Sequence, residues 1–169
     1  SVSLSSVGTR LAIGTPANDG NGISSGHVRV YEYTSGIWMQ MGNDIDGDAE
    51  GDYSGQSVSL SDDGFILAIG ANYNDGNGID AGQVRIYQYE DSGWVQMGED
   101  IFGEAAGDGS GHSISLSGDG FRVAIGAFSN DGNGLGSGHV RVYQYLGDSW
   151  FQVGEDIDGE AEDDYSGNS

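Results

Sequence analysis

Short runs of aliphatic, β-branched and aromatic residues alternate along the whole chain with runs rich in Gly, Asp, Asn and Ser. In the middle third of the chain, the apolar-rich runs are 56–61, 65–71, 83–90 and 94–101. Val, Ile, Tyr and Trp favour strands, whereas the residues between the runs favour tight turns. No segment has the apolar spacing of an amphipathic helix. The pattern therefore predicts an all-β protein made of short strands.

The strand-and-turn pattern recurs three times with a period of 56 residues. The repeated landmarks are SVSLS or SISLS at 1, 57 and 113, AIG at 12, 68 and 124, and NDGNG at 18, 74 and 130. A fixed period of this length indicates stacked supersecondary units. Residues 1–169 are therefore predicted to form one repeat array with units 1–56, 57–112 and 113–168, and Ser169 begins a fourth.

Four antiparallel strands in each repeat of about 50 residues are typical of a β-propeller blade. Apolar residues occupy both faces of the predicted strands, with Val84 and Ile86 on one face and Tyr87 and Tyr89 on the other. This suits a blade, which packs against a neighbour on each side. Because three blades do not close a ring, we expect part of a larger ring or array. A β-trefoil, which also has three four-stranded units, is the alternative.

The segments SGQSVSLSDDGFILAIGAN (54–72) and IGTP (13–16) resemble FG-GAP repeats, the blades of integrin-α-type propellers. All three units have the family's order of elements, which is a strand, a turn, a second strand, the IG motif and then G-x-V-R-V/I-Y. The resemblance implies a ring of about seven blades. The family's calcium hairpin is replaced here by the short turns SSVG, SDDG and SGDG. We therefore expect no metal site at Asp62, Asp63 or Asp119, because calcium takes six to eight oxygen ligands.

The chain is strongly acidic, with a net charge of −22 from 27 Asp and Glu against five Arg and no Lys. Nucleic acid and membrane insertion are excluded as partners, because the basic surface and the apolar span that they need are missing. There is no Cys, so disulfides and thiolate metal sites are ruled out as well. The chain opens on SVSLS without a Met, and we expect a piece of a longer or processed polypeptide.

Three related acidic tracts occupy 44–55, 100–111 and 156–167. We predict that they carry the chain from the outermost strand of one blade to the innermost strand of the next. In an up-and-down blade these crossings emerge beside the loop that contains NDGNG, which, with the flanking Glu99 and Glu155, would place 20 of the 27 acids on one rim. Crowding raises carboxylate pKa values unless cations offset it. Arg29, Arg85 and Arg141 follow the loops and are predicted to pair with these acids.

Two sets of oxygen-bearing residues are candidate calcium ligands. The EF-hand spacing fails in the first tract, because Gly47 and Gly55 stand in the wrong places. The first set lies in the NDGNG loops: Asp19, Asn21, Asp75, Asn77, Asp80, Asp131 and Asn133. The second set repeats at i, i+4 and i+8 in the tracts: Asp44, Asp48, Asp52, Asp100, Glu104, Asp108, Asp156, Glu160 and Asp164. The alternative for the loops is an Asx-turn, in which these side chains bind their own backbone.

Other candidate residues fit structural roles better than chemistry. The motif GHSIS lacks the second Gly of a hydrolase elbow, and its Ser113 lies on a repeated strand. His27 and His139 are replaced by Gln83 in the middle unit, so we expect polar residues at strand ends rather than catalytic groups. The repeated tryptophans are predicted to be mostly buried between blades rather than stacked on sugars: Trp38, Trp94 and Trp150.

Threefold repetition of every candidate argues against catalysis, which usually needs one asymmetric site. We therefore expect an extracellular or cell-surface β-propeller, not an enzyme, that serves binding, adhesion or structural assembly, with calcium as a stabilising ion. A lectin-like propeller is the alternative, and a hydrolase or lyase domain is the less favoured one. The expected partners are further copies of the chain, further blades of the same polypeptide, or a protein or carbohydrate ligand.

Overall fold

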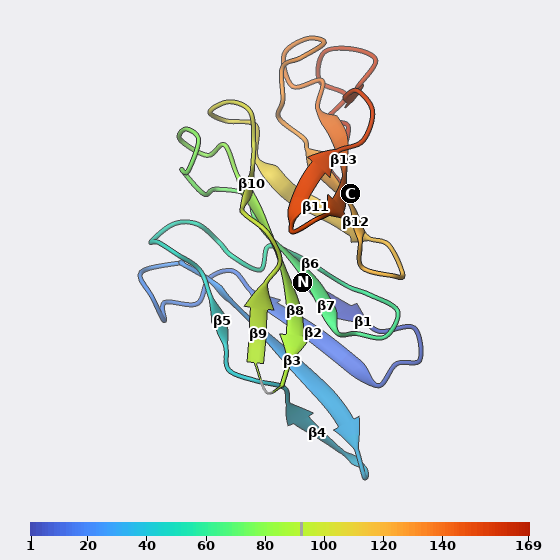
Figure 1. The fold of residues 1–169 in the computed structure, drawn as a ribbon. Helices are drawn as coiled ribbons and strands as arrows, with labels where there is room; N and C mark the ends of the chain where they lie inside the picture. The colour runs from blue at the N-terminus through green and yellow to red at the C-terminus, as the bar shows by residue number, and fades with distance from the viewer. Residues whose placement is uncertain (92) are drawn as a thin grey trace.

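The computed structural model describes residues 1–91 and 93–169, in which three antiparallel sheets follow one another (Figure 1). Blade 1 comprises β1 (Val2–Leu4), β2 (Arg10–Thr15), β3 (His27–Thr34), β4 (Ile37–Gln40) and β5 (Ile45–Asp46). Blade 2 comprises β6 (Ser57–Leu60), β7 (Ile66–Ala71), β8 (Gln83–Glu90), β9 (Gly93–Gln96) and β10 (Ile101–Phe102). Blade 3 comprises β11 (Ser110–Leu116), β12 (Arg122–Ala127), β13 (His139–Leu146), β14 (Ser149–Gln152) and β15 (Ile157–Asp158). The predicted all-β repeat is confirmed.

The outer strand of every blade is split into two pieces. In blade 1, β4 pairs with one end of β3 and β5 with the other, and the Met41 N–H donates to the Val30 carbonyl at the break. Gly42, Gly98 and Gly154 follow the break with φ between 71° and 79°, a left-handed conformation that favours glycine. The fourth strand expected at 94–101 is therefore β9 and β10 with a bend between them.

The blades stack face to face, and two apolar clusters fill the spaces between them. The first joins Ala12, Val28, Val30, Met41 and Ile45 of blade 1 to Val58, Leu60, Leu67, Ile69 and Tyr87 of blade 2. The second joins the equivalent residues of blades 2 and 3. We call the side facing the preceding blade the leading face, and the side facing the following blade the trailing face. Among the described residues, strand ladders stay within a blade, which rejects the trefoil alternative.

The serines of the first strand and the glycine of AIG hold neighbouring blades together. In blade 2, the Ser57 hydroxyl donates to the Gly111 carbonyl (2.7 Å), and the Ser59 hydroxyl accepts the Leu116 N–H of blade 3 (3.0 Å). A Cβ on Gly70 would overlap the Gly111 carbonyl oxygen. The crossing chain can therefore lie this close to the second strand only where that strand carries glycine.

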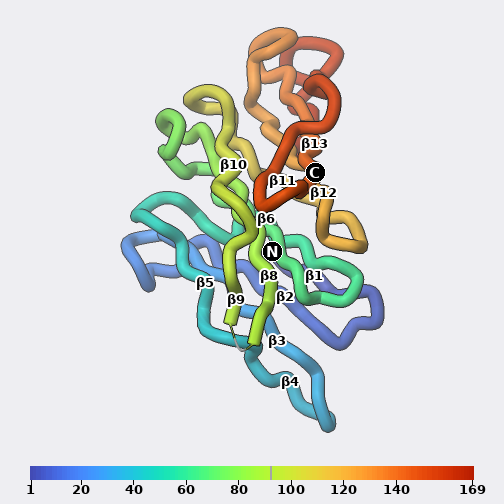
Figure 2. The backbone as a smooth tube through the Cα atoms, viewed as in Figure 1, coloured from blue at the N-terminus to red at the C-terminus, as the bar shows by residue number. Residues whose placement is uncertain are grey.

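The loops divide between two rims of the molecule. Figure 2 shows the long second-to-third loops and the crossing segments on one side of the sheets, and the short first-to-second turns on the other. Backbone bonds join a loop to the crossing of its own blade, as between the Ser54 N–H and the Ser25 carbonyl (3.0 Å). The acidic tracts are thus the crossings between blades, as predicted. No helix in the described part of the chain is long and apolar enough to span a membrane.

Candidate functional site

The NDGNG loops fold onto the acidic tract of their own blade. In blade 1, Asp19 Oδ1 accepts the Ser24 N–H (2.8 Å), and Asn21 Nδ2 donates to the carbonyls of Gly47 (2.9 Å) and Asp48 (3.2 Å). Asp75 and Asp131 accept the equivalent backbone N–H in the other two loops, from Asp80 and Gly136. Asn77 and Asn133 donate to the equivalent tract carbonyls. These side chains thus bind backbone groups of the loop and of the tract, whereas the Asx-turns are made by Asn18, Asn74 and Asn130, whose side-chain oxygens accept the N–H two residues on. Calcium in these loops stays a prediction.

The first acid of each tract is anchored to the third and fourth strands of its own blade. The Arg29 guanidinium contacts Asp44 through Nε (2.9 Å) and NH2 (2.7 Å), and Gln40 also donates to this carboxylate (2.7 Å). Hydrogen bonding to Arg29 lowers the pKa of Asp44 to about 2. Arg141 does the same for Asp156, whose pKa also falls to about 2. Asp100 instead accepts from Gln83 and Gln96, at 2.7 Å each.

The second acid of a tract reaches the following blade. Arg85 of blade 2 donates to Asp48 Oδ1 of the first tract (2.7 Å), and Arg141 of blade 3 pairs with Glu104 of the second tract. Both arginines are nearly covered, with side chains 9% and 12% exposed. Arg29 lies on the leading face of blade 1, where no blade precedes it among the described residues, and 43% of its side chain is exposed. The predicted Arg–carboxylate pairing is therefore also an interblade contact.

The third acid closes a turn inside the tract. Asp52 accepts the Ala49 N–H (3.0 Å), and Asp108 and Asp164 make the equivalent bonds to Ala105 and Ala161. Asn74 of blade 2 also donates to Asp52 (3.0 Å), and burial raises the pKa of this carboxyl group. The spacing i, i+4 and i+8 therefore supplies three separate contacts and does not bring the acids to one point.

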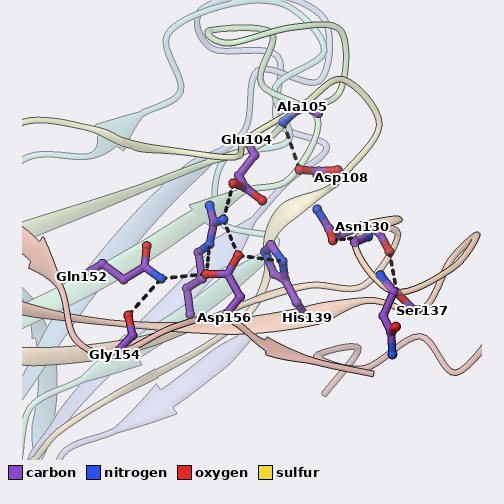
Figure 3. A network of polar contacts seen from close by, with 12 residues as sticks. Glu104, Ala105, Asp108, Asn130, Ser137, His139, Gln152, Gly154 and Asp156 are labelled. Carbon is purple, nitrogen blue, oxygen red and sulfur yellow. Dashed lines mark hydrogen bonds and ion pairs between the residues drawn. The ribbon is translucent and has the colours of Figure 1, made fainter. Parts of the chain in front are cut away.

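One group of potential metal ligands does converge within the described residues, at Glu104, His139 and Asp156 (Figure 3). Their ligand atoms lie within 4.8 Å of one another. Arg141 contacts both carboxylates, so the cluster already contains a cation. Burial lowers the pKa of His139, which favours the neutral imidazole. Sequence reasoning did not assemble this group, because Glu104 belongs to the preceding blade.

The tryptophans have two different environments. The Trp94 indole N–H donates to the Met41 carbonyl of blade 1 (2.9 Å), and Trp150 makes the same bond to Met97 of blade 2 (2.8 Å). Both rings pack partly buried against the interblade clusters, which supports the predicted packing role. Trp38 is not mostly buried, since it is 44% exposed and no blade among the described residues covers the leading face of blade 1.

The candidate serine motif also has a structural role. The Ser113 hydroxyl donates to the Gly167 carbonyl (2.7 Å), and its neighbour His112 packs on the Phe128 ring at 4.4 Å. This repeats the bond that Ser57 makes one blade earlier. Ser113 is therefore part of the stacking contact, with its proton committed to a backbone carbonyl.

Two equivalent grooves run along the joints between blades. Asn43, Asp44, Ile45 and Asp46 line the first on one side, and Tyr87, Gly93 and Trp94 line it on the other. The second is lined by the corresponding residues Glu99, Asp100, Ile101, Phe102, Tyr143, Ser149 and Trp150. Each groove thus combines carboxylates with the side of an indole ring, and the same combination recurs at successive joints.

Comparisons with known proteins agree with this architecture. Residues 43–87 match the FG-GAP repeat, a span that contains the first acidic tract and the first two strands of blade 2. Among curated proteins no sequence matches the chain. One similar solved structure is a protein from Bacteroides uniformis described provisionally as a 6-phosphogluconolactonase, with 15% identity and a TM-score of 0.61. The similarity covers 93% of this chain but 39% of that protein, so it concerns the fold alone. The chain is therefore an array of three β-propeller blades, of which residues 43–87 match the FG-GAP repeat.

Proposed function

We propose that the chain is a binding and assembly module of an extracellular or cell-surface protein, and that its acidic rim takes a basic protein partner. The observation that carries this proposal is the recurrence of polar arrangements from one blade to another. The Arg29–Asp44 pair recurs as Arg141–Asp156, and the Asp48–Arg85 contact recurs as Glu104–Arg141. Repetition of this kind suits a surface that binds at several equivalent points.

The electrostatics of the rim favour a basic partner. Sixteen acids lie in the tracts, counted with the flanking Glu99 and Glu155, and four more lie in the second-to-third loops. Arg29, Arg85 and Arg141, by contrast, are committed to internal pairs. The rim therefore keeps a large negative excess, which attracts cationic surfaces and accelerates their association. The FG-GAP match supports the extracellular assignment, because the resemblance is to blades of cell-surface receptors.

The experiment compares two triple variants of equal charge change. The rim variant carries Asp158→Asn, Glu160→Gln and Glu162→Gln, all at exposed positions of the third tract. The control carries Glu90→Gln, Asp91→Asn and Asp148→Asn on the short turns of the opposite rim, which are also exposed. With an oligo-lysine peptide on a sensor surface, the rim variant should bind about tenfold more weakly, and the control should change little. Equal losses in both variants would reduce the effect to net charge and reject a rim site.

Calcium binding is tested separately on the wild-type chain. Thermal melts in millimolar calcium are compared with melts in sodium chloride at the same ionic strength, since screening alone acts on any crowded acidic rim. Ligation by Asp75 and its loop would raise the melting temperature beyond the sodium control, because binding to the folded state adds stability. Equal midpoints reject a specific site, and a calcium effect that is lost with Asp100→Ala but survives Asp75→Ala places it in the tract.

A carbohydrate ligand is the second candidate, and the interblade grooves favour it. The Trp94 and Tyr87 rings beside Asp44 and Asp46 combine an aromatic surface with hydrogen-bond acceptors. A glycan array with wild-type chain tests this candidate, and binding that disappears with Asp46→Asn, an exposed groove position, but not with the rim triple variant would assign the function to the grooves.

A further inference from the structure

The second-to-third loop of every blade carries one large aliphatic side chain at the surface. Ile23, Ile79 and Leu135 hold equivalent positions, one repeat apart, and are 66%, 71% and 64% exposed. We call these three residues the aliphatic row. Blade 2 packs against a blade on each side, yet Ile79 is the most exposed of the three. The exposure therefore belongs to the loop itself, and a further blade stacked on either end of the array would leave it unchanged.

The backbone around each residue of the row is held in place by hydrogen bonds. In blade 2, the Ile79 carbonyl accepts the Gly107 N–H of the acidic tract (2.8 Å). The next residue, Asp80, has a φ of 55° and donates its N–H to Asp75 Oδ1 (2.9 Å). The same bonds recur in blades 1 and 3. The three loops therefore display the aliphatic row from one fixed backbone conformation.

The aliphatic row differs from other exposed apolar residues in being both repeated and placed among acids. Val7, on the rim of the short turns, is 75% exposed, but its equivalents in the other blades are Asp63 and Asp119. A second repeated row is 50–55% exposed, but it lies on the half of the outer strand that is next to the short-turn rim: Met39, Val95 and Phe151.

Carboxylates lie close to the aliphatic row. Each residue of the row follows an exposed loop aspartate by four positions, namely Asp19, Asp75 or Asp131. In blade 1, a Cβ on Gly22, which precedes Ile23, would lie 3.1 Å from the Cα of Glu50, and Glu50 is itself exposed. An anionic partner is repelled by such a surface, and a purely apolar partner would have to desolvate the carboxylates. A partner that carries both cationic and aliphatic side chains is complementary to it.

We propose that the aliphatic row docks the apolar side chains of an amphipathic basic segment of a partner protein, whose Lys and Arg residues meet the surrounding acids. This inference rests on the basic partner proposed above for the acidic rim, and it specifies the chemistry of that partner. The contact is repeated once per blade, so a segment that spans successive loops gains affinity from each. Charge attracts many cationic surfaces, whereas the row selects those with aliphatic residues between their charges.

The experiment separates the aliphatic contribution from charge. The row variant carries Ile23→Ser, Ile79→Ser and Leu135→Ser, and the control carries Met39→Ser, Val95→Ser and Phe151→Ser, so that neither changes the net charge. Two peptides with the same number of lysines are placed on a sensor surface, one with leucines and one with serines between the lysines. Binding is measured in about 150 mM sodium chloride, which screens exposed charges and leaves apolar contacts in place. Thermal melts verify that each variant is folded, and Ile79→Ser alone repeats the comparison with the smallest change.

The wild-type chain and the control should bind the lysine–leucine peptide about tenfold more tightly than the lysine–serine peptide. The row variant should lose this difference and bind the lysine–serine peptide as the wild type does. Equal affinity of the wild type for the two peptides would reject the role of the row and leave the basic partner standing, whereas failure of both peptides to bind would reject the basic partner as well. Equal losses in the row variant and the control would also overturn the proposal. Binding to phosphatidylcholine vesicles that only the row variant loses would assign the row to a lipid surface instead.

Discussion

Replacement of Trp94 by Ala is the most direct probe of how the blades hold one another. A tryptophan side chain buries about 150–250 Å² of surface, and Trp94 is partly covered by blade 1. At about 25 cal/mol per Å², the lost burial is worth about 3 kcal/mol. Loss of the hydrogen bond to the Met41 carbonyl adds about 1 kcal/mol. We therefore expect Trp94→Ala to lower the free energy of unfolding by about 4 kcal/mol, within the usual range for Trp→Ala.

Trp38 provides the internal control, because it has the same place in its blade but is not covered by another blade among the described residues. Its ring packs on Tyr33 at 5.2 Å, and nearly half of the side chain is exposed, so Trp38→Ala should cost about 1 kcal/mol.

Urea unfolding, followed by circular dichroism, measures both changes. Equal costs at Trp38 and Trp94 would show that the tryptophans stabilise their own hairpins and would refute the role assigned to the interblade contact.

Three further predictions concern the backbone contact, the interblade ion pair and pH. Gly70→Ala should lower the free energy of unfolding, measured with urea, by about 3 kcal/mol, because the added Cβ would displace the Gly111 carbonyl. Gly93 faces open space, so Gly93→Ala should change the free energy of unfolding by no more than about 0.5 kcal/mol. Arg85→Ala should cost about 2–3 kcal/mol, because it leaves Asp48 without its partner and opens space at the joint, and the exposed Arg29 should tolerate the same change with a distinctly smaller loss. Asp156 has a pKa of about 2 in the folded chain against 3.8 when unperturbed, so its contribution is present above pH 3.8 and is lost as the pH falls towards 2. Asp156→Asn should therefore lower stability by about 1–2 kcal/mol at pH 7 but have little effect near pH 2, as measured by urea unfolding at each pH. An effect that is equal at both pH values would contradict this assignment.

The sequence by itself determined the strands, the period and the kind of fold. Strand propensity and turn residues act locally, and they are repeated three times, so that units 1–56, 57–112 and 113–168 could be aligned without coordinates. The two-faced apolar pattern of residues such as Val84 and Tyr87 reports a sheet covered on both sides, which predicted stacked blades. Because the crossings follow from strand order, the position of the acidic tracts was also predictable.

The tertiary structure decided what each repeated residue does, because those roles depend on the neighbouring blade. Asp44, Asp48 and Asp52 are similar acids at regular spacing, yet the first binds its own blade, the second binds the next and the third closes a turn. Glu104 meets His139 and Asp156 only because two blades lie side by side. Trp38 and Trp94 are indistinguishable in the repeat pattern but differ in burial, since a preceding blade covers only one of them. Local sequence sets the conformation of a blade, whereas burial and the interblade ion pairs are set by contacts between neighbouring blades.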